Sequence, residues 1–442
     1  MSELFDPLSA AGPVHAEVDD RAWLRAMLDF ERALAAAQAE VGLIESGHAE
    51  AIAVACDVDN YDPAGIGASA VGVGNPAAPL VRALTQRVTG DAARHVHLGA
   101  TSQDVLDTAA MLVLRRATTA LLSTVDKAAR HAATLALAHR DTPQAGRTLG
   151  QQALPVTFGL TAAGWLTGLC NTRNRLRALR FPAQLGGASG TLASLGAHGG
   201  AVLAALARHL DLAEPVLPWH TERTSLVAIA AAFAETAGVA GGIARTITQL
   251  AQTEVGELTE EGPTGTGGSS TLPHKRNPVA AVLAAGSAAQ APGLLATLYS
   301  VQPQEHQRAM GAWHAEWRPL AELARVTGSA VHWTAESLAR LHVHPGRMRE
   351  NLDRTGGLLL AERVTTELAP VLGRLAAHDA VTGCALGAVE GGDFAGRLAA
   401  DPVLGGHLTA QRIAELLDPA GYLGSAGLFV DRALAAYHGE TP

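Results

Sequence analysis

A long apolar stripe between Leu226 and Val255 limits what this chain can fold into more than any other feature. Its hydrophobic residues recur mostly at spacings of three, four or seven, which is the pattern of one buried face of an α-helix. The predicted helix, residues 226–258, spans about nine turns, and helices of this length usually belong to bundles. The stripe consists of Leu226, Ile229, Phe233, Val239, Ile243, Ile247, Leu250 and Val255.

The rest of the chain supports an all-α fold class. Of the 442 residues, 48% are hydrophobic but only 4% are aromatic. A core built mainly from Ala, Leu and Val favours close-packed helices over a large sheet. Because the apolar faces of such a bundle exceed what one chain can cover, we also expect a homo-oligomer. Similar periodic patterns predict helices over residues 21–41, 104–139, 155–179, 279–298 and 316–341.

Charge and cysteine content exclude several classes of protein. The formal net charge of −9 argues against a general nucleic-acid binder or a membrane-surface binder, since both need basic patches. Three widely spaced cysteines without a C-x-x-C pair indicate a reducing compartment. The N-terminus shows no secretory signal, and charged or His residues interrupt the long apolar runs. We therefore expect a cytoplasmic protein with no nucleic-acid and no membrane partner.

The glycine-rich loop 267–278 is the strongest candidate for a functional site. Asn277 is predicted to be the N-cap, and Pro278 the first residue, of the apolar helix that follows. A helix N-terminus attracts an anion, and Lys275 adds a full positive charge, which suits a carboxylate-rich ligand. Ser269 lies upstream, on a loop able to close over a bound ligand. An ordinary solvated linker has the same composition.

Two more loops of similar character precede predicted helices. Residues 97–104 contain Thr101 and Asp104, which are spaced like an acidic variant of a capping box. Residues 146–152 precede a helix entered through Pro155. Taken singly, each loop is explained by routine helix capping. Taken together with the glycine-rich loop, they supply hydroxyl, amide and cationic donors that can hold two or three carboxylates.

Other chemistries find less support in the sequence. The pairs His95/His97 and His342/His344 lack the i, i+4 spacing of helical metal ligands, and no acid or Cys supplies an obvious third ligand. The glycine-rich stretches have neither a G-x-G-x-x-G order after a strand nor the Walker lysine. The surroundings of Ser269 do not fit a nucleophile elbow. We therefore predict no cofactor and no metal.

At these loops the chain resembles the fumarase, aspartase and argininosuccinate lyase superfamily, whose signature is a Gly-Ser-Ser-x-x-Pro-x-Lys-x-Asn loop. Residues 268–277 match that signature, and the similarity extends over essentially the whole chain. Within the superfamily, the chain is most similar to the bacterial 3-carboxy-cis,cis-muconate cycloisomerases. The segments that carry this closer resemblance are 99–104, 268–278, 304–308, 311–317 and 417–424.

The resemblance implies an L-aspartase-like, all-helical subunit of three domains that forms a homotetramer. The implied domains are an N-terminal helical domain over residues 1–98, a central long-helix bundle over 99–345 and a C-terminal helical domain over 346–442. It further implies active sites that are shared between subunits, act on a small polycarboxylate and need no cofactor.

The resemblance also implies roles for individual residues. Ser269 corresponds to the catalytic base of the family, and Lys275 and Asn277 correspond to groups that bind and polarise a substrate carboxylate. Such groups would stabilise an enediolate, the carbanion that forms next to a carboxylate. Further substrate-binding positions correspond to His97, Thr101, Ser102, Arg147, Gln151 and Arg308.

One departure from the family bears on the leaving group. Members similar to adenylosuccinate lyase have His after an Arg-Thr pair, whereas Leu149 follows Arg147-Thr148 here. An amine leaving group needs a proton, but a carboxylate, with a conjugate-acid pKa of about 4, leaves unassisted. The expected activity is therefore the cycloisomerisation of 3-carboxy-cis,cis-muconate to carboxymuconolactone. The alternatives are elimination of a stable anion such as nitrite from nitrosuccinate, adenylosuccinate cleavage, and a catalytically silent scaffold, which has no need of the signature loop.

Overall fold

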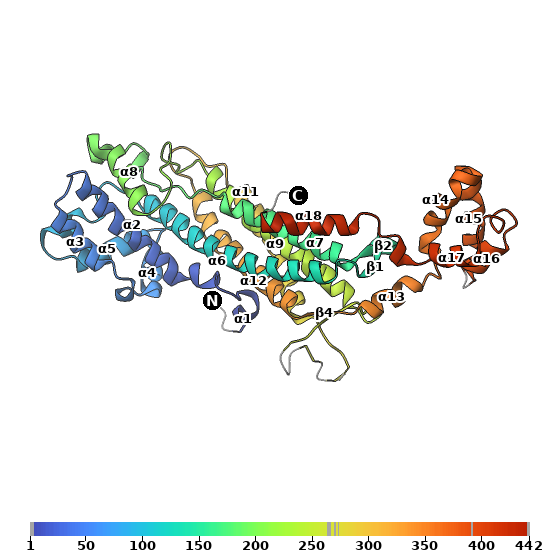
Figure 1. Cartoon of the computed structure of the whole chain (residues 1–442). Helices are drawn as coiled ribbons and strands as arrows, with labels where there is room; N and C mark the ends of the chain where they lie inside the picture. The colour runs from blue at the N-terminus through green and yellow to red at the C-terminus, as the bar shows by residue number, and fades with distance from the viewer. Residues whose placement is uncertain (1–3, 263–266, 269–270, 273, 390–391, 440–442) are drawn as a thin grey trace. The chain divides into compact units, whose positions relative to one another are not determined.

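The computed structural model describes residues 4–262, 267–268, 271–272, 274–389 and 392–439 (Figure 1). The chain is predominantly helical, and the strands among the described residues form two short, two-stranded antiparallel sheets. The predicted all-α fold class is confirmed.

The chain divides into two compact units. Unit 1 contains Met1–Asp126, Asn171–Gly242 and Leu283–Thr334, and unit 2 contains Lys127–Cys170, Ile243–Val282 and Ala335–Pro442. The long helices α6 (Ser102–Ala138), α9 (Thr224–Leu250) and α12 (Ala312–Ala339) have residues in both units. The boundaries at 98/99 and 345/346 that the family resemblance implies stay a prediction.

Shorter helices make up the rest of unit 1. The first long one, α2, begins after Asp19, whose carboxylate accepts a hydrogen bond from the N–H of Ala22 at 2.7 Å. One face of α2 is buried along its whole length. The helices are α1 (Asp6–Ser9), α2 (Asp20–Glu40), α3 (Ser46–Ala55), α4 (Pro63–Ala70), α5 (Ala77–Arg87), α8 (Gly199–His209) and α11 (Ala291–Ser300).

Unit 2 combines two small sheets with short helices. Strands β1 (Pro143–Thr148) and β2 (Gln151–Thr157) form a hairpin, and β3 (Leu258–Glu260) pairs with β4 (Leu341–Val343). A separate apolar core, which includes Val364, Leu398 and Ile413, lies among its last helices. Unit 2 contains the first part of α7 (Phe158–Arg177) and the first part of α10 (Val279–Ala288). It also contains the whole of α13 (Pro345–Asp353), α14 (Ala361–Leu372), α15 (Arg374–Ala388), α16 (Phe394–Ala400), α17 (Ala410–Leu416) and α18 (Ala426–His438).

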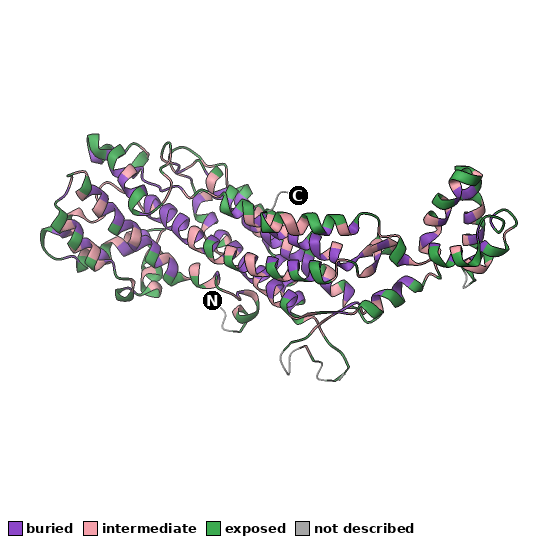
Figure 2. Cartoon of the chain, viewed as in Figure 1, coloured by how far each residue is buried: buried purple, intermediate pink, exposed green. Residues whose placement is uncertain are grey.

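The central apolar stripe is buried as predicted over most of its length, and Figure 2 shows buried residues along the long helices. The helix nevertheless ends at Leu250 rather than at residue 258. It ends early because Gly256 adopts a left-handed φ of +64° and the next residues pair as β3 with β4. The buried residues of the stripe are Leu226, Ile229, Phe233, Ile243, Ile247 and Leu250.

Two further segments differ from the prediction. Residues 146–152, expected to be a loop, form the tip of the β1/β2 hairpin, where Leu149 and Gly150 have φ values of +52° and +80°. Two left-handed residues are the turn that matches the twist of paired strands. The helix predicted over 279–298 is divided into α10 and α11. Pro292 lies in the first turn of α11, where it has no N–H to continue the ladder of α10.

Two segments are long and apolar enough to cross a membrane, judged by length and composition alone. The first is α9, in which the most apolar stretch of 18 residues has a mean hydropathy of 1.7 and is 61% buried, as a core helix of a bundle requires. In the second, Val279–Ser300, the corresponding stretch has a mean hydropathy of 1.5 but is only 33% buried. Its exposed apolar surface therefore has no cover within the described part of the chain.

A buried ion network joins the long helices within unit 1. Arg223, which immediately precedes α9, has a fully buried side chain. Its guanidinium donates to Asp107 of α6 at 2.8 and 3.0 Å and to Glu316 of α12 at 3.0 and 2.6 Å. The indole of Trp313 also donates to Asp107 at 3.0 Å, and the ring of Trp219 lies 4.9 Å from the guanidinium carbon. Burial raises the pKa of Glu316, and the adjacent Arg223 opposes that rise.

Replacement of Arg223 by Met should strongly destabilise the protein, because it leaves two carboxylates buried without their cation. Breaking such a pair typically costs about 3–5 kcal/mol. Thermal unfolding followed by circular dichroism measures the effect. The matched control is Arg175→Met, because Arg175 forms an exposed ion pair with Glu235, and such pairs contribute about 1 kcal/mol or less. Equal losses in the two variants would contradict the role of the network.

Candidate active site

Asp104 organises the start of α6, where Thr101 and Ser102 were predicted to bind substrate. It is fully buried, and its Oδ2 accepts hydrogen bonds from the N–H groups of Thr101 and Gly187, each at 2.9 Å. Its Oδ1 accepts from the N–H of Gly186 at 2.9 Å and lies 2.7 Å from Nε2 of His220. The acidic capping box is therefore realised through the carboxylate, which reaches back to Thr101 as predicted. This carboxylate fixes the position of the two predicted hydroxyl residues.

Arg308 lies beside the first turn of α6. Its guanidinium donates to the carbonyl of Ala188 at 2.9 Å and approaches the amide oxygen of Gln103 at 3.4 Å. Gln103 itself is buried and donates to Asp107 and to the carbonyl of His220. In the part of the chain that the structure describes, no carboxylate lies within ion-pair distance of Arg308. Its charge is available for an anion at this end of the helix.

His97 occupies the loop that leads into α6 and forms a pair with Glu31 of α2. Its Nδ1 lies 2.7 Å from Oε1 of Glu31, which is 1% exposed. The pKa of His97 is raised above its ordinary value. Burial by itself would lower the pKa, but the charge and hydrogen bond of Glu31 and the charge of Asp104 together outweigh the effect of burial. The structure thus groups four predicted residues around the start of α6 in unit 1: His97, Thr101, Ser102 and Arg308.

Arg147 has a carboxylate partner of its own in unit 2. It lies on β1, and its guanidinium contacts Glu257 at 2.5 and 3.2 Å. Glu257 is fully buried and also accepts hydrogen bonds from Gln144 at 2.8 Å and Asn351 at 2.7 Å. Because Glu257 neutralises it, Arg147 offers less free charge to a substrate than Arg308 does. Gln151 begins β2 at the hairpin tip and is exposed.

The glycine-rich loop is closed at its base in unit 2. The N–H of Asn277 donates to the carbonyl of Gly267 at 2.9 Å, and Gly268 and Arg276 form an antiparallel bridge next to it. Lys275 is exposed on the returning limb, and the described residues include no ion-pair partner for it. Ser269, the predicted base, lies outside the described residues.

The helix after this loop differs from the prediction in what it binds. It begins at Val279, and the N–H groups of Ala280 and Ala281 donate to the two carboxylate oxygens of Glu260 at 3.0 and 2.9 Å. The expected anion at this helix N-terminus is therefore a side chain of the protein itself, from β3. Neither of these N–H groups is available to a substrate while Glu260 stays in place. Asn277 does not act as the predicted side-chain cap in the described contacts.

Sequence reasoning missed the carboxylates that support the predicted residues, namely Glu31, Glu257 and Glu260. For Glu31 a signal was present. It stands on the apolar stripe of α2, seven residues after Leu24 and seven before Gln38, and all three side chains are buried. A charged residue on a buried stripe needs a partner. The roles of all predicted site residues stay predictions.

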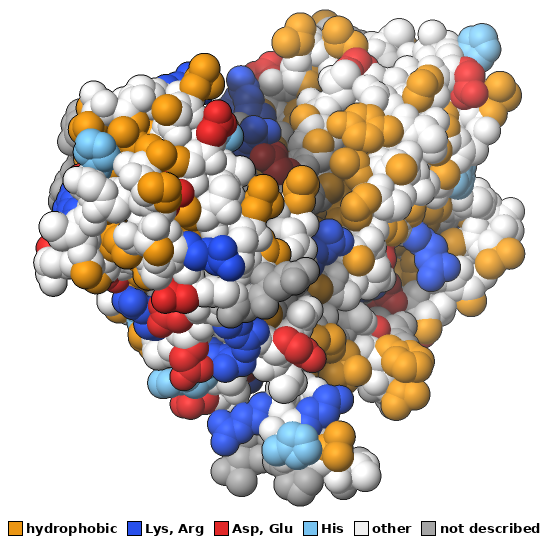
Figure 3. Space-filling model, turned by 90° about the vertical axis from the view of Figure 1, so that its right-hand side faces the viewer, with side chains coloured by type: hydrophobic (Ala, Val, Ile, Leu, Met, Phe, Trp, Pro, Cys, Tyr) orange, Lys and Arg blue, Asp and Glu red, His pale blue; other side chains and the backbone are white. Residues whose placement is uncertain are grey.

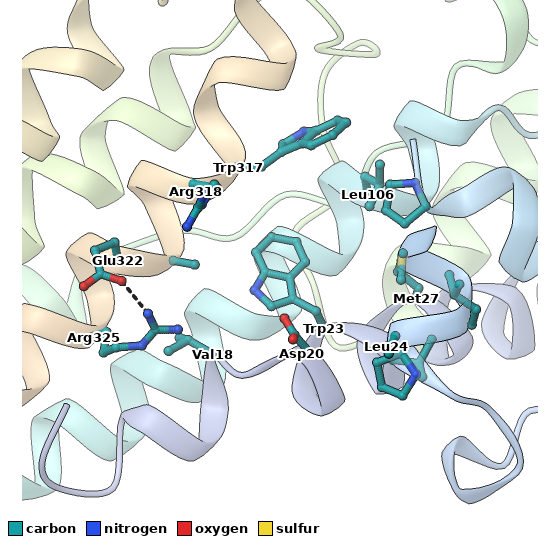
Figure 4. Close-up of a pocket in the computed structure, with 16 residues that line it drawn as sticks. Val18, Asp20, Trp23, Leu24, Met27, Leu106, Trp317, Arg318, Glu322 and Arg325 are labelled. Atoms are coloured by element: carbon teal, nitrogen blue, oxygen red, sulfur yellow. Dashed lines mark hydrogen bonds and ion pairs between the residues drawn. The ribbon is translucent and has the colours of Figure 1, made fainter. Parts of the chain in front are cut away.

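Two cavities lie near these elements, each within one unit. The first, of about 490 Å³, is mainly apolar; Figure 4 shows the indoles of Trp23 on α2 and Trp317 on α12 around it. None of the described residues predicted for the site lines it. The second, of about 660 Å³, lies in unit 2 and is lined by polar groups that include Gln144, Arg147 and Thr161. Of the two, the second has the polarity that a carboxylate ligand requires.

Comparisons with known proteins agree with this architecture. A family model described as "Lyase" matches residues 8–293, and one described as "Adenylosuccinate lyase C-terminus" matches residues 357–433. The chain is 45% identical over 444 residues to a 3-carboxy-cis,cis-muconate cycloisomerase of Pseudomonas aeruginosa, which covers 99% of this chain and 97% of that protein. It is 44% identical over 447 residues to a nitrosuccinate lyase of Streptomyces davaonensis, which covers 98% of this chain and 94% of that protein.

The fold is shared with a solved relative. The crystal structure of the 3-carboxy-cis,cis-muconate lactonizing enzyme from Pseudomonas putida superposes with a TM-score of 0.94 at 43% identity, over 99% of each chain. A fumarate lyase from Mesorhizobium superposes with a TM-score of 0.87 at 35% identity, over 96% of this chain and 97% of that one. The chain therefore belongs to the fumarase/aspartase superfamily of lyases, as the resemblance of its loops indicated.

Proposed function

We propose that this protein is a cofactor-independent cycloisomerase that converts 3-carboxy-cis,cis-muconate to carboxymuconolactone in the catabolism of protocatechuate. The observation that carries the proposal is the match to enzymes of that name over the full length of the chain, in both sequence and fold. The charges at the start of α6 support it, since Arg308 has no carboxylate partner among the described residues and the pKa of His97 is raised. Arg308 and the protonated form of His97 suit a substrate with several carboxylates.

The proposed reaction needs no oxidant or reductant. One substrate carboxylate oxygen adds to a carbon of a C=C bond, so that a C–O bond forms and the π electrons move toward the neighbouring carbon. Lys275 and Asn277 stabilise the resulting enediolate, whose negative charge is larger than that of the ground state. Ser269 then supplies a proton to the neighbouring carbon and regains one from water, so the lactone carries one proton more than the substrate trianion. In the reverse reaction Ser269 removes that proton from the carbon.

Nitrosuccinate cleavage into nitrite and fumarate is the second candidate. It is supported by the relative of that name and by the residue at the hairpin tip. Leu149 stands there with a fully exposed side chain and carries no proton. Both nitrite and a carboxylate depart as stable anions, so neither reaction requires an acid at that position.

We also propose that the chain acts as a homotetramer in the cytoplasm, with active sites shared between subunits. The segment Val279–Ser300 supports assembly, since its most apolar stretch of 18 residues is only 33% buried. On the face of the molecule shown in Figure 3, hydrophobic side chains are scattered among charged ones. On Val279–Ser300, Val282 and Tyr299 are 53% and 50% exposed. A second copy of the chain would cover this surface. Three widely spaced cysteines without a C-x-x-C pair fit a reducing compartment.

A panel of four substrates should separate the candidate activities. We expect the purified protein to consume 3-carboxy-cis,cis-muconate, followed by the loss of its ultraviolet absorbance, and to act at most weakly on nitrosuccinate, adenylosuccinate and fumarate. Release of nitrite from nitrosuccinate without any turnover of the muconate would replace the first proposal by the second. Inactivity on all four would favour the silent scaffold.

Ser269→Ala should reduce kcat by about two orders of magnitude or more, because it removes the group that transfers the proton. Ser270→Ala is the matched control, since it removes a neighbouring hydroxyl from the same loop and should leave kcat within a few-fold of wild type. Size-exclusion chromatography would verify that both variants keep the native assembly. Normal turnover by the Ser269 variant would refute the assigned base.

The mass of the assembly, measured by light scattering, should be four times that of one chain. Val282→Glu places a charge on the exposed apolar face of α10 and should dissociate the tetramer. Val54→Glu is the control, because Val54 is 80% exposed on α3, outside that face. A monomeric wild type, or an intact tetramer in the Val282 variant, would contradict this use of the α10 surface.

A further inference from the structure

Glu31 is a buried carboxylate whose hydrogen bonding is directed almost entirely at one group. Its Oε1 lies 2.7 Å from Nδ1 of His97, whereas its Oε2 is buried and has no hydrogen-bond partner among the described residues. A carboxylate in this position destabilises the fold unless a positive charge compensates it. The ring of His97 is the group at hydrogen-bond distance that can carry that charge.

The other charged groups around the pair do not replace His97. Asp104 on α6 faces it with a negative charge. Asp29 and Arg32, which stand close to Glu31 in the sequence of α2, act electrostatically on Cys56, and Arg32 donates to the carbonyl of Cys56 at 2.8 Å rather than to Glu31. Burial raises the pKa of the Cys56 thiol to about 12, so this thiol is neutral at physiological pH.

Helix α2 also fixes the backbone around His97. Gln38, on the same buried face as Glu31, donates to the carbonyl of Leu98 at 2.7 Å. His97 has a left-handed φ of +59°, a conformation that is unfavourable for a residue other than glycine. Nε2 of His97 has no hydrogen-bond partner among the described residues, and 19% of the side chain is exposed. One ring nitrogen is thus bound to Glu31, and the other is open.

We propose that Glu31 is a positioning residue for His97, which it orients through Nδ1 so that Nε2–H binds a carboxylate of the substrate. Glu31 does not touch the substrate in this arrangement. The inference rests on the proposed function, because it places a polycarboxylate at the start of α6. It adds to that function a residue of α2 that no feature of the three loops indicates.

The charge of Glu31 shifts the pKa of His97 in a definite direction. The charge of Glu31 favours the protonated form of His97, in which both ring nitrogens are donors. Removal of that charge lowers the pKa of His97, so the protonated form is lost at a lower pH. Any activity that depends on protonated His97 then declines at a lower pH as well.

Glu31→Gln tests the inference, because it removes the charge while keeping the size of the side chain. The matched control is Glu40→Gln: Glu40 lies at the end of the same helix and pairs with His209 at 2.9 Å on the surface. Titration of ¹³C-labelled histidines by NMR, assigned with His97→Gln, should show the His97 midpoint lowered by about one pH unit or more in the Glu31 variant alone. The alkaline limb of kcat/KM should move by the same amount.

A double variant separates positioning from folding. If Glu31 acts through His97, then Glu31→Gln causes no further loss of kcat/KM in a His97→Gln background. An unchanged His97 midpoint, or an equal loss in both backgrounds, would overturn the inference while leaving the cycloisomerase assignment intact. A lowered midpoint in a chain that turns over none of the four substrates would instead overturn the proposed function and, with it, the substrate contact.

Discussion

A single buried cation between two buried carboxylates is the interaction on which unit 1 depends. Arg223 precedes α9 and binds Asp107 of α6 and Glu316 of α12, so three long helices meet at one guanidinium. The same two carboxylates are linked to the candidate site by hydrogen bonds. Asp107 accepts a hydrogen bond from Gln103, which in turn contacts Arg308. Glu316 accepts a hydrogen bond from Gln304, in the loop that carries Arg308. The core network and the open cation of the site are therefore parts of one connected structure.

Carboxylates of the protein itself also bind polar groups in unit 2, but there they neutralise what the sequence offers as ligand-binding groups. Glu257 forms an ion pair with Arg147, and Glu260 accepts hydrogen bonds from the N–H groups at the N-terminus of α10. Lys275 is left as an exposed cation on the glycine-rich loop. The groups that remain for a polyanion are thus fewer than the three loops suggest. Arg308 and Lys275 have no carboxylate partner among the described residues, whereas His97 is paired with Glu31 through one ring nitrogen and has the other open.

This distinction bears on how members of the superfamily differ in chemistry. The helical scaffold is common to relatives whose names denote cycloisomerisation, nitrosuccinate cleavage and fumarate lyase activity. The scaffold therefore fixes the fold without fixing the leaving group. In this chain the hairpin tip presents Leu149, an exposed side chain without a proton to give, which suits leaving groups that depart as stable anions.

The sequence by itself determined the all-α class, the long central helices and the reach of Asp104 back to Thr101, because apolar periodicity and capping depend on residues within a few positions of each other. Only the tertiary structure decided the hairpin around Leu149, the capture of the α10 N-terminus by Glu260 and the pairing of Glu31 with His97. Glu260 and Glu31 contact residues at least 20 positions away, which is beyond the reach of local patterns. The hairpin turn has Leu149 where the usual two-residue turn has Asn, Asp or Gly. A Glu on an apolar stripe indicates that its carboxylate needs a partner, but only the tertiary structure identifies that partner.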